Sequence, residues 1–215
     1  MEILKLAQAG SEEYHNQIKI IAKKLKEGEI IVYPTDTIYG IGGNGLNENI
    51  IGKIFSIKQR TTEKALPLLV KNVEMAEKLT FIDKKVKKIL EAIWPGPITA
   101  VLWKRKIVPL KLTGNAETVA LRWAKNNFLE MLFQYIDFPL ISTSANISGR
   151  ENIYKTDGLI KTFEESVIKP DLIIDGGDLE QNLPASTIID LTKPKPLILR
   201  VGAVKPEELL KILEI

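Results

Sequence analysis

Apolar residues recur along the chain with the two spacings that are typical of helices and strands. Over residues 11–27 they are separated by four, three and four positions, which predicts an amphipathic helix with Ser11 at its N-cap and Gly28 just beyond its end. Short uninterrupted apolar runs are typical of buried strands, and the segment 29–33 is the first of these. The pattern therefore predicts a chain in which helices and strands follow one another.

The same two patterns continue to the end of the chain. Further helices are expected at 48–57 with Asn47 as the cap, from Asn72, from Asp83 to Trp94, at 127–136, at 156–165 and from Pro206 onward. Further strands are expected at 66–70, 98–103, 118–122, 139–142, 171–174, 186–191 and 197–201. This alternation predicts an α/β fold with one twisted mixed sheet flanked by helices. No repeat or linker divides the sequence, so we expect a single domain over residues 1–215.

Composition excludes several classes of site. The 215 residues include no cysteine, which excludes disulfides, thiolate metal centres and a cysteine nucleophile. The only histidine, His15, lies in the first turn of a predicted helix, so a histidine-based triad or metal site is not expected. No apolar run reaches 18 residues and no signal peptide is evident, so we expect a cytoplasmic protein without a membrane segment.

Charge is unevenly distributed along the chain. Residues 51–111 hold 14 Lys and Arg against 5 Asp and Glu, whereas the formal net charge of the whole chain is only +3. The lysines in the helix that starts at Asp83 are interpreted as a solvated helix face, because apolar residues alternate with them. The middle third is nevertheless basic enough to attract an anion.

Three polar loops are candidates for ligand contacts. The segment 35–45 contains four glycines, and its composition fits an anion-binding loop and a plain turn equally well. Lys58, Arg60 and Lys64 follow a helix; three such cations can hold phosphates, although a helix C-terminus alone would explain them. The segment 142–149 offers four hydroxyl groups and an amide after an apolar strand, which favours a ligand loop over a helix cap.

Two further arginines end predicted strands and extend this candidate site. Arg122 closes the strand at 118–122 and Arg200 lies in the strand at 197–201, while Ser186 opens a third strand. A site made of hydroxyl, amide and cationic groups, without a histidine or cysteine, suits reactions that depend on positioning and charge stabilisation. Nucleotidyl or phosphoryl transfer is the leading case.

An ordered set of segments resembles the YrdC-like family of threonylcarbamoyl-AMP synthases, in its short, single-domain form. Each segment alone is modest, but the order is specific and spans about residues 30–202. Larger members carry a further C-terminal domain, for which this chain is expected to be too short. The sequence departs from the family pattern at Thr61, Ala65, Leu69, Val70 and Trp123. The matching segments are Tyr33–Gly42, Lys58–Arg60, Lys64–Val70, Trp94–Thr99, Val119–Arg122, Ser142–Gly149, Ser186–Asp190 and Leu199–Gly202.

The resemblance implies a reaction in which L-threonine, bicarbonate or CO2, and ATP give L-threonylcarbamoyl-AMP and pyrophosphate. It implies catalytic roles for Lys58 and Arg60. It further implies that Mg²⁺ accompanies ATP without a protein metal site, and that a tRNA threonylcarbamoyltransferase complex uses the product on an adenosine beside the anticodon. By the family pattern, ATP is bound by Lys58, Arg60, Lys64, Ser144, Asn146 and Arg200. Threonine is bound by Thr35, Thr37, Arg122, Ser142 and Ser186.

Two other functions are open alternatives to this interpretation. The basic middle third also fits a non-catalytic module that binds tRNA or double-stranded RNA, although no RNA-binding signature is present. Weak binding of such RNA is also compatible with the enzyme. The second alternative is a carbamoyl-adenylate-forming domain like that of hydrogenase maturation proteins, which sits in a much longer chain rich in cysteine.

Overall fold

A computed structural model describes residues 1–180 and 183–213 of the chain. Its helices are α1 (Glu12–Lys26), α2 (Glu48–Lys58), α3 (Val73–Leu79), α4 (Lys84–Ile93), α5 (Asn127–Leu132), α6 (Thr156–Glu164) and α7 (Pro206–Leu213), with a 3-10 helix η1 at Leu110–Thr113. Its strands are β1 (Glu2–Lys5), β2 (Ile31–Tyr33), β3 (Gly40–Gly42), β4 (Leu68–Leu69), β5 (Ile98–Trp103), β6 (Thr118–Arg122), β7 (Leu140–Ile141), β8 (Thr143–Ser144), β9 (Leu172–Asp175), β10 (Thr187–Asp190) and β11 (Leu197–Arg200).

The strands form two mixed sheets, so the predicted α/β fold with mixed pairing is confirmed. The five-stranded sheet has the order β1-β9-β2-β3-β8, and the six-stranded sheet has the order β11-β10-β5-β6-β4-β7. The strand pairing is divided between these two sheets, which an isolated bridge between Asn44 and Leu140 connects. The strand predicted at 139–142 leaves the six-stranded sheet at Ile141, and the start of the segment predicted as a ligand loop joins the five-stranded sheet at Thr143, with only Ser142 between. The two sheets therefore meet at this crossing.

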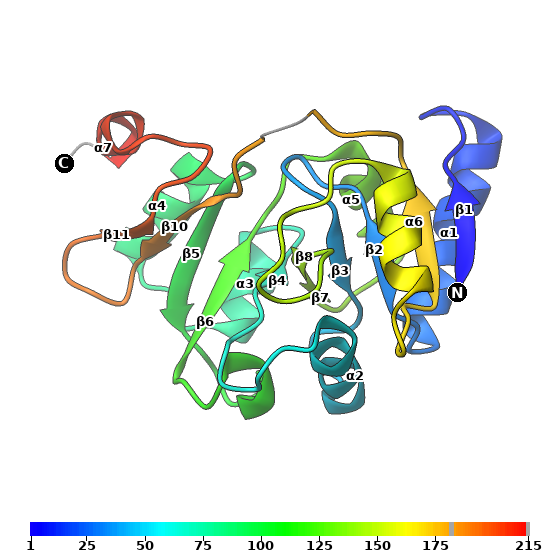
Figure 1. Ribbon diagram of the computed structural model, residues 1–215. Helices are drawn as coiled ribbons and strands as arrows, with labels where there is room; N and C mark the ends of the chain where they lie inside the picture. Colours follow the sequence, from blue (N-terminus) through cyan, green and yellow to red (C-terminus); the bar gives the residue numbers. More distant parts are fainter. Residues whose placement is uncertain (181–182, 214–215) are drawn as a thin grey trace.

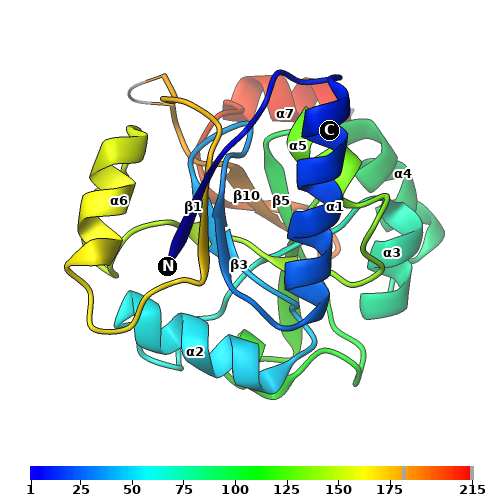
Figure 2. The same ribbon diagram turned by 90° about the vertical axis from the view of Figure 1, so that its right-hand side faces the viewer.

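Helices flank both sheets, with α3 and α4 beside the six-stranded sheet and α1 and α6 beside the five-stranded sheet (Figure 1). In the turned view, α1 and α6 lie on opposite faces of the five-stranded sheet (Figure 2). Helix α4 contacts both α3 and α7 beside the six-stranded sheet. None of the helices in the described part of the chain is long and apolar enough to cross a membrane.

The core and the helix ends follow the sequence pattern closely. Strand β2 is entirely buried, as an uninterrupted apolar run predicts for a central strand, and Ile18, Ile21 and Leu25 of α1 are fully buried against the sheet side of the helix. The predicted N-caps are confirmed, since each accepts a hydrogen bond from a backbone N–H in the first turn: Ser11, Asn47, Asn72 and Asp83.

Several short elements differ from their predictions. The apolar run 66–70 contributes only two residues to a strand, and the helix expected at 127–136 ends at Leu132. Strand β1 was not predicted, and neither was β3, which lies inside the glycine-rich segment assigned to a loop. The glycine at position 42 of β3 allows the backbone of β7, in the other sheet, to come very close. An ideal Cβ placed on Gly42 would lie 1.7 Å from the carbonyl oxygen of Ile141.

We expect Gly42→Ala to destabilise the fold by about 3 kcal/mol or more, because the new methyl group meets backbone that cannot move alone. Gly52→Ala is the matched control: its Cβ would meet only the Nζ end of the Lys111 side chain, and alanine favours the α2 helix. Urea unfolding followed by circular dichroism measures both. Equal stabilities of the two variants would show that β3 and β7 can separate without cost.

Candidate active site

A cavity of about 360 Å³ lies where the two sheets meet. Residues of both sheets and of the loops at their junction line it, and most of the polar side chains among them carry a hydroxyl or a guanidinium group. The polar and charged residues that line it are Thr35, Thr37, Tyr39, Arg60, Thr99, Arg122, Ser142, Thr143, Ser144, Asn152, Ser186 and Arg200. The crossing segment 140–144 explains the position of Ser142, which lies between the two sheets.

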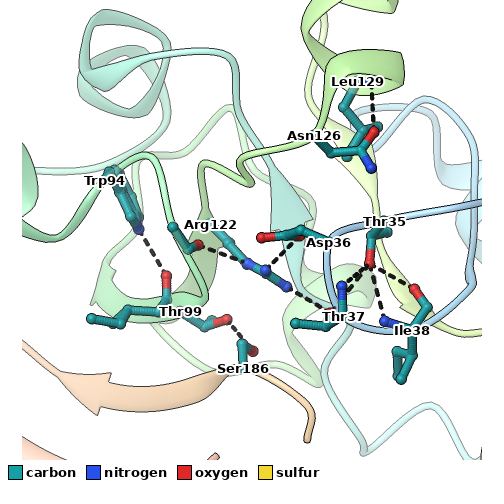
Figure 3. Close-up of polar contacts among 12 residues, drawn as sticks. Thr35, Asp36, Thr37, Ile38, Trp94, Thr99, Arg122, Asn126, Leu129 and Ser186 are labelled. Atoms are coloured by element: carbon teal, nitrogen blue, oxygen red, sulfur yellow. Dashed lines mark hydrogen bonds and ion pairs between the residues drawn. The ribbon is translucent and has the colours of Figure 1, made fainter. Parts of the chain in front are cut away.

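Thr35 and Thr37 form one side of the cavity, in the turn between β2 and β3 (Figure 3). The Thr35 hydroxyl donates to the carbonyl oxygen of Ile38 at 2.6 Å and accepts from the backbone N–H groups of Thr37 and Ile38. Because this hydroxyl is satisfied within its own turn, it holds the shape of the loop. Thr37 is also buried, and its hydroxyl oxygen accepts a hydrogen bond from the guanidinium of Arg122.

Arg122 is held at the end of β6 by three partners from separate parts of the chain. Its guanidinium donates to Asp36 Oδ1 at 2.6 Å, to Thr37 Oγ1 at 3.1 Å and to the carbonyl oxygen of Gly96 at 3.1 Å (Figure 3). Burial lowers the pKa of Arg122, and the carboxylate of Asp36 opposes that shift. A guanidinium has five N–H groups, so two remain for a ligand while three fix its plane.

Ser186 and Thr99 form a second polar group on the six-stranded sheet. Their hydroxyl oxygens are 2.8 Å apart, with Thr99 on β5 and Ser186 just before β10 (Figure 3). Arg200, on the neighbouring β11, donates to the carbonyl oxygen of Ser186 at 2.7 Å and lines the same cavity. Burial lowers the pKa of Arg200, as expected for a cation that is partly removed from water.

Arg60 reaches the cavity because the chain turns sharply after α2. Gln59 adopts the left-handed conformation with φ of 50°, and the backbone N–H of Arg60 returns to the carbonyl oxygen of Phe55. The Arg60 side chain donates to the carbonyl oxygens of Lys64 and Ala65, which fixes the following loop around it. Burial lowers the pKa of Arg60.

Lys58, the last residue of α2, is only 1% exposed and lies behind the 142–151 loop. Its ammonium donates to the carbonyl oxygen of Ser144, to the carbonyl oxygen of Asn146 at 2.8 Å and to Asn146 Oδ1 at 3.1 Å. Burial, with a smaller contribution from the charge of Arg60, lowers the pKa of Lys58 to about 7. The three oxygen acceptors favour the charged form and act against this shift.

The structure brings together most of the residues predicted from the sequence. Eight line the cavity: Thr35, Thr37, Arg60, Arg122, Ser142, Ser144, Ser186 and Arg200. Three of the predicted ATP ligands are not among the lining residues. Lys58 and Asn146 contact each other behind Ser144, and Lys64 is exposed with its carbonyl oxygen bonded to Arg60. Direct ATP contacts by these three residues stay predictions.

Sequence reasoning did not assign roles to three residues that help form the site. Asp36 and Thr99 were included only as members of the matching segments Tyr33–Gly42 and Trp94–Thr99. The Tyr39 hydroxyl donates to the carbonyl oxygen of Gly177 at 2.7 Å and accepts from the N–H of Gly176, so it ties a distant loop to the cavity wall. A polar residue within the apolar strand 98–103 was the available signal for Thr99, but nothing in the sequence indicated the partners of Tyr39.

Comparisons with known proteins identify relatives of the whole described fold. The family model described as Telomere recombination, for Sua5, YciO and YrdC proteins, matches residues 23–202. A threonylcarbamoyl-AMP synthase of Pyrococcus abyssi is 34% identical over 92% of this chain, which spans 57% of that relative. A putative threonylcarbamoyl-AMP synthase of Methanocaldococcus jannaschii is 31% identical over 97% of this chain and 96% of its own.

A solved structure confirms the expected fold. The crystal structure of Pyrococcus abyssi Sua5 complexed with L-threonine superposes with a TM-score of 0.89 at 32% identity, over 99% of this chain and 61% of that one. The chain thus spans less than two thirds of the length of both Pyrococcus proteins. The family and the architecture inferred from the ordered motifs are therefore confirmed.

We expect the free energy of unfolding of the wild type, relative to that of Lys58→Met, to increase as pH rises from about 7 to 10. In the folded protein Lys58 loses its proton near pH 7, whereas an unfolded lysine keeps it to about pH 10.4. Between these values the unfolded chain binds more protons, so the wild type gains stability with pH, by up to about 1.4 kcal/mol per pH unit. Urea unfolding of both proteins across this range measures the difference, and parallel pH profiles would contradict the lowered pKa.

Proposed function

Because the chain belongs to the Sua5, YciO and YrdC family, we propose that it makes L-threonylcarbamoyl-AMP and pyrophosphate from L-threonine, bicarbonate or CO2, and ATP. The threonine amine adds to CO2 and, after losing protons, becomes a carbamate. A carbamate oxygen then forms a bond to the α-phosphorus of ATP as the bond to pyrophosphate breaks. Neither step requires a covalent enzyme nucleophile, which fits a cavity lined by hydroxyl and guanidinium groups.

The observation that carries this proposal is the placement of three guanidinium groups around one cavity between the sheets. Arg122 comes from β6, Arg60 from the turn after α2 and Arg200 from β11, and all three line the same space. The reaction has to bring together a carboxylate, a carbamate and a triphosphate, which repel one another in water. Fixed cations in a site partly removed from water reduce that repulsion more strongly than solvated ones do.

Threonine fits the end of the cavity where Arg122 is fixed. Two N–H groups of its guanidinium are free of the contacts to Asp36, Thr37 and Gly96, and a planar pair of donors suits a carboxylate. The hydroxyl groups of Ser142 and Ser186 line the same cavity and can bond to the amine or hydroxyl of threonine. The structure of the Pyrococcus relative in complex with L-threonine supports this substrate.

ATP fits the side of the cavity formed by Arg60, Ser144 and Arg200. The two arginines are suited to bidentate contacts with phosphate oxygens, and the hydroxyl of Ser144 supplies a neutral donor. Within residues 1–180 and 183–213, no cluster of three His, Cys, Asp or Glu side chains is placed to hold a metal ion. We therefore assign Mg²⁺ to the triphosphate of ATP, where it would neutralise charge on the leaving pyrophosphate.

The product is a mixed anhydride, so a second enzyme has to use it. We propose that a tRNA threonylcarbamoyltransferase complex in the cytoplasm transfers the threonylcarbamoyl group to an adenosine beside the anticodon. Weak binding of tRNA or double-stranded RNA by this chain is compatible with that sequence of reactions. The names of the relatives support the enzyme over a non-catalytic RNA-binding module.

The direct test is pyrophosphate release by the purified protein with ATP and Mg²⁺. We expect release to require both threonine and bicarbonate and to proceed without tRNA. Serine should be poorer by about 10–200-fold because it lacks one methyl group, and glycine poorer still because it also lacks the hydroxyl. Release that requires tRNA, or equal rates with all three amino acids, would contradict the proposal.

We expect Arg60→Ala to lower turnover by roughly a hundredfold or more and Arg60→Lys by less, because an ammonium replaces the two-pronged contact with a point charge. Arg105→Ala is the matched control, since Arg105 is exposed and stacks on Phe81 outside the cavity. Pyrophosphate release gives the rates, and circular dichroism melting checks the fold. A much lower melting temperature of Arg60→Ala would instead assign Arg60 a structural role.

A further inference from the structure

The ammonium of Lys58 has an unusual environment for a charge next to a substrate cavity. It is buried, and all three of its hydrogens are directed to oxygens of the 142–151 loop. Among the residues that the structure describes, no carboxylate forms an ion pair with it. A buried cation normally requires a partner or full hydrogen bonding, and here only neutral oxygens fulfil that requirement.

Asn146 connects this ammonium to both ends of the loop. Its Oδ1 accepts from Lys58 and, at 2.6 Å, from the hydroxyl of Ser144. Its Nδ2 donates to the carbonyl oxygens of Arg150 at 2.5 Å and Glu151 at 3.2 Å. The Asn146 side chain therefore forms hydrogen bonds to four groups, an ammonium, a hydroxyl and two carbonyl oxygens, and these bonds connect the beginning of the loop to its end.

A backbone contact attaches the same loop to the end of α2. The N–H of Ser148 donates to the carbonyl oxygen of Lys58 at 2.8 Å, so the lysine holds the loop through both its main chain and its side chain. The carbonyl oxygen of Ser144 accepts from the ammonium of Lys58, which is not among the residues that line the cavity, although Ser144 is. A carbonyl oxygen turned into that cavity would repel a triphosphate.

We propose that Lys58, together with Asn146, is a positioning residue that shapes the 142–151 loop and does not itself contact the phosphates of ATP. The proposal depends on the proposed function in one respect, which is that ATP binds in this cavity. Lys58 acts on the ligand through the placement of Ser144. Arg60 and Arg200, which do line the cavity, make the direct phosphate contacts.

The experiment measures hydrogen exchange of the backbone amides of residues 142–151 in the protein without ATP. Lys58→Met and Asn146→Ala should each speed exchange there by roughly tenfold or more, while the strands that lie outside residues 142–151 keep their protection. The matched control is Lys53→Met, which removes an exposed lysine from the same helix and should leave the loop unchanged. Because no ATP is present, the result does not depend on which product the enzyme makes.

Non-additivity provides the second measurement. Lys58 and Asn146 share one side-chain contact and hold the same loop, so their effects should not be independent: the double variant should exchange more slowly in the loop than the product of the two single effects predicts. In the pyrophosphate assay the loss in Lys58→Met should appear mainly in kcat, because ATP keeps its direct ligands. If Lys58→Met does not fold, Asn146→Ala tests the same contact.

Two results would overturn the proposal. Unchanged exchange of the loop in Lys58→Met, or in Asn146→Ala where only that variant folds, would show that the loop keeps its shape without the contact. Unchanged exchange together with a raised KM for ATP in Lys58→Met would instead indicate that Lys58 contacts the phosphates directly. Faster exchange spread evenly over both sheets would instead assign Lys58 to the general stability of the core.

Discussion

The ion pair between Arg122 and Asp36 is the contact on which the geometry of the site depends. Asp36 belongs to the turn after β2 in one sheet, and Arg122 ends β6 in the other, so their 2.6 Å contact joins the two sheets across the junction. Both side chains are largely buried, which makes an unpaired Arg122 costly and keeps the guanidinium in one place. The distance between Arg122 and the arginines on the opposite side of the cavity, Arg60 and Arg200, is therefore set by how the sheets are joined.

The crossing segment 140–144 makes the second connection between the sheets, and it determines what the wall of the cavity is made of. Because the chain leaves one sheet at Ile141 and enters the other at Thr143, Ser142 has no place in either ladder. Its backbone N–H instead donates to the carbonyl oxygen of Pro67 at 2.9 Å, and its side chain lines the cavity. Close approach of the strands at Gly42 allows this arrangement, since any side chain there would meet the backbone of Ile141.

Much of this fold could be predicted from the sequence because it depends on local patterns. The spacing of apolar residues located α1 and the buried strand β2, and the residue types at Asn47 and Asp83 located two helix starts. The division into two sheets could not be predicted in the same way. It depends on which strands pair over long separations, and a single residue, Ser142, separates the two sheets along the chain. The glycine-rich strand β3 lacks the β-branched and aromatic residues that usually indicate a strand.

The candidate site shows the same division between local and long-range information. Residue types alone indicated that Arg60, Arg122 and Arg200 belong to an anion site, because few other roles suit several strand-end and helix-end arginines together with hydroxyl-rich loops. The sequence does not show which cation faces the ligand and which is turned toward the protein. That depends on the path of the chain after α2, where the left-handed Gln59 sends Arg60 to the cavity and leaves Lys58 behind the loop. Two cations of one motif, separated by a single residue, thus have different surroundings: Arg60 lines the cavity, and Lys58 is bonded to backbone oxygens of the neighbouring loop.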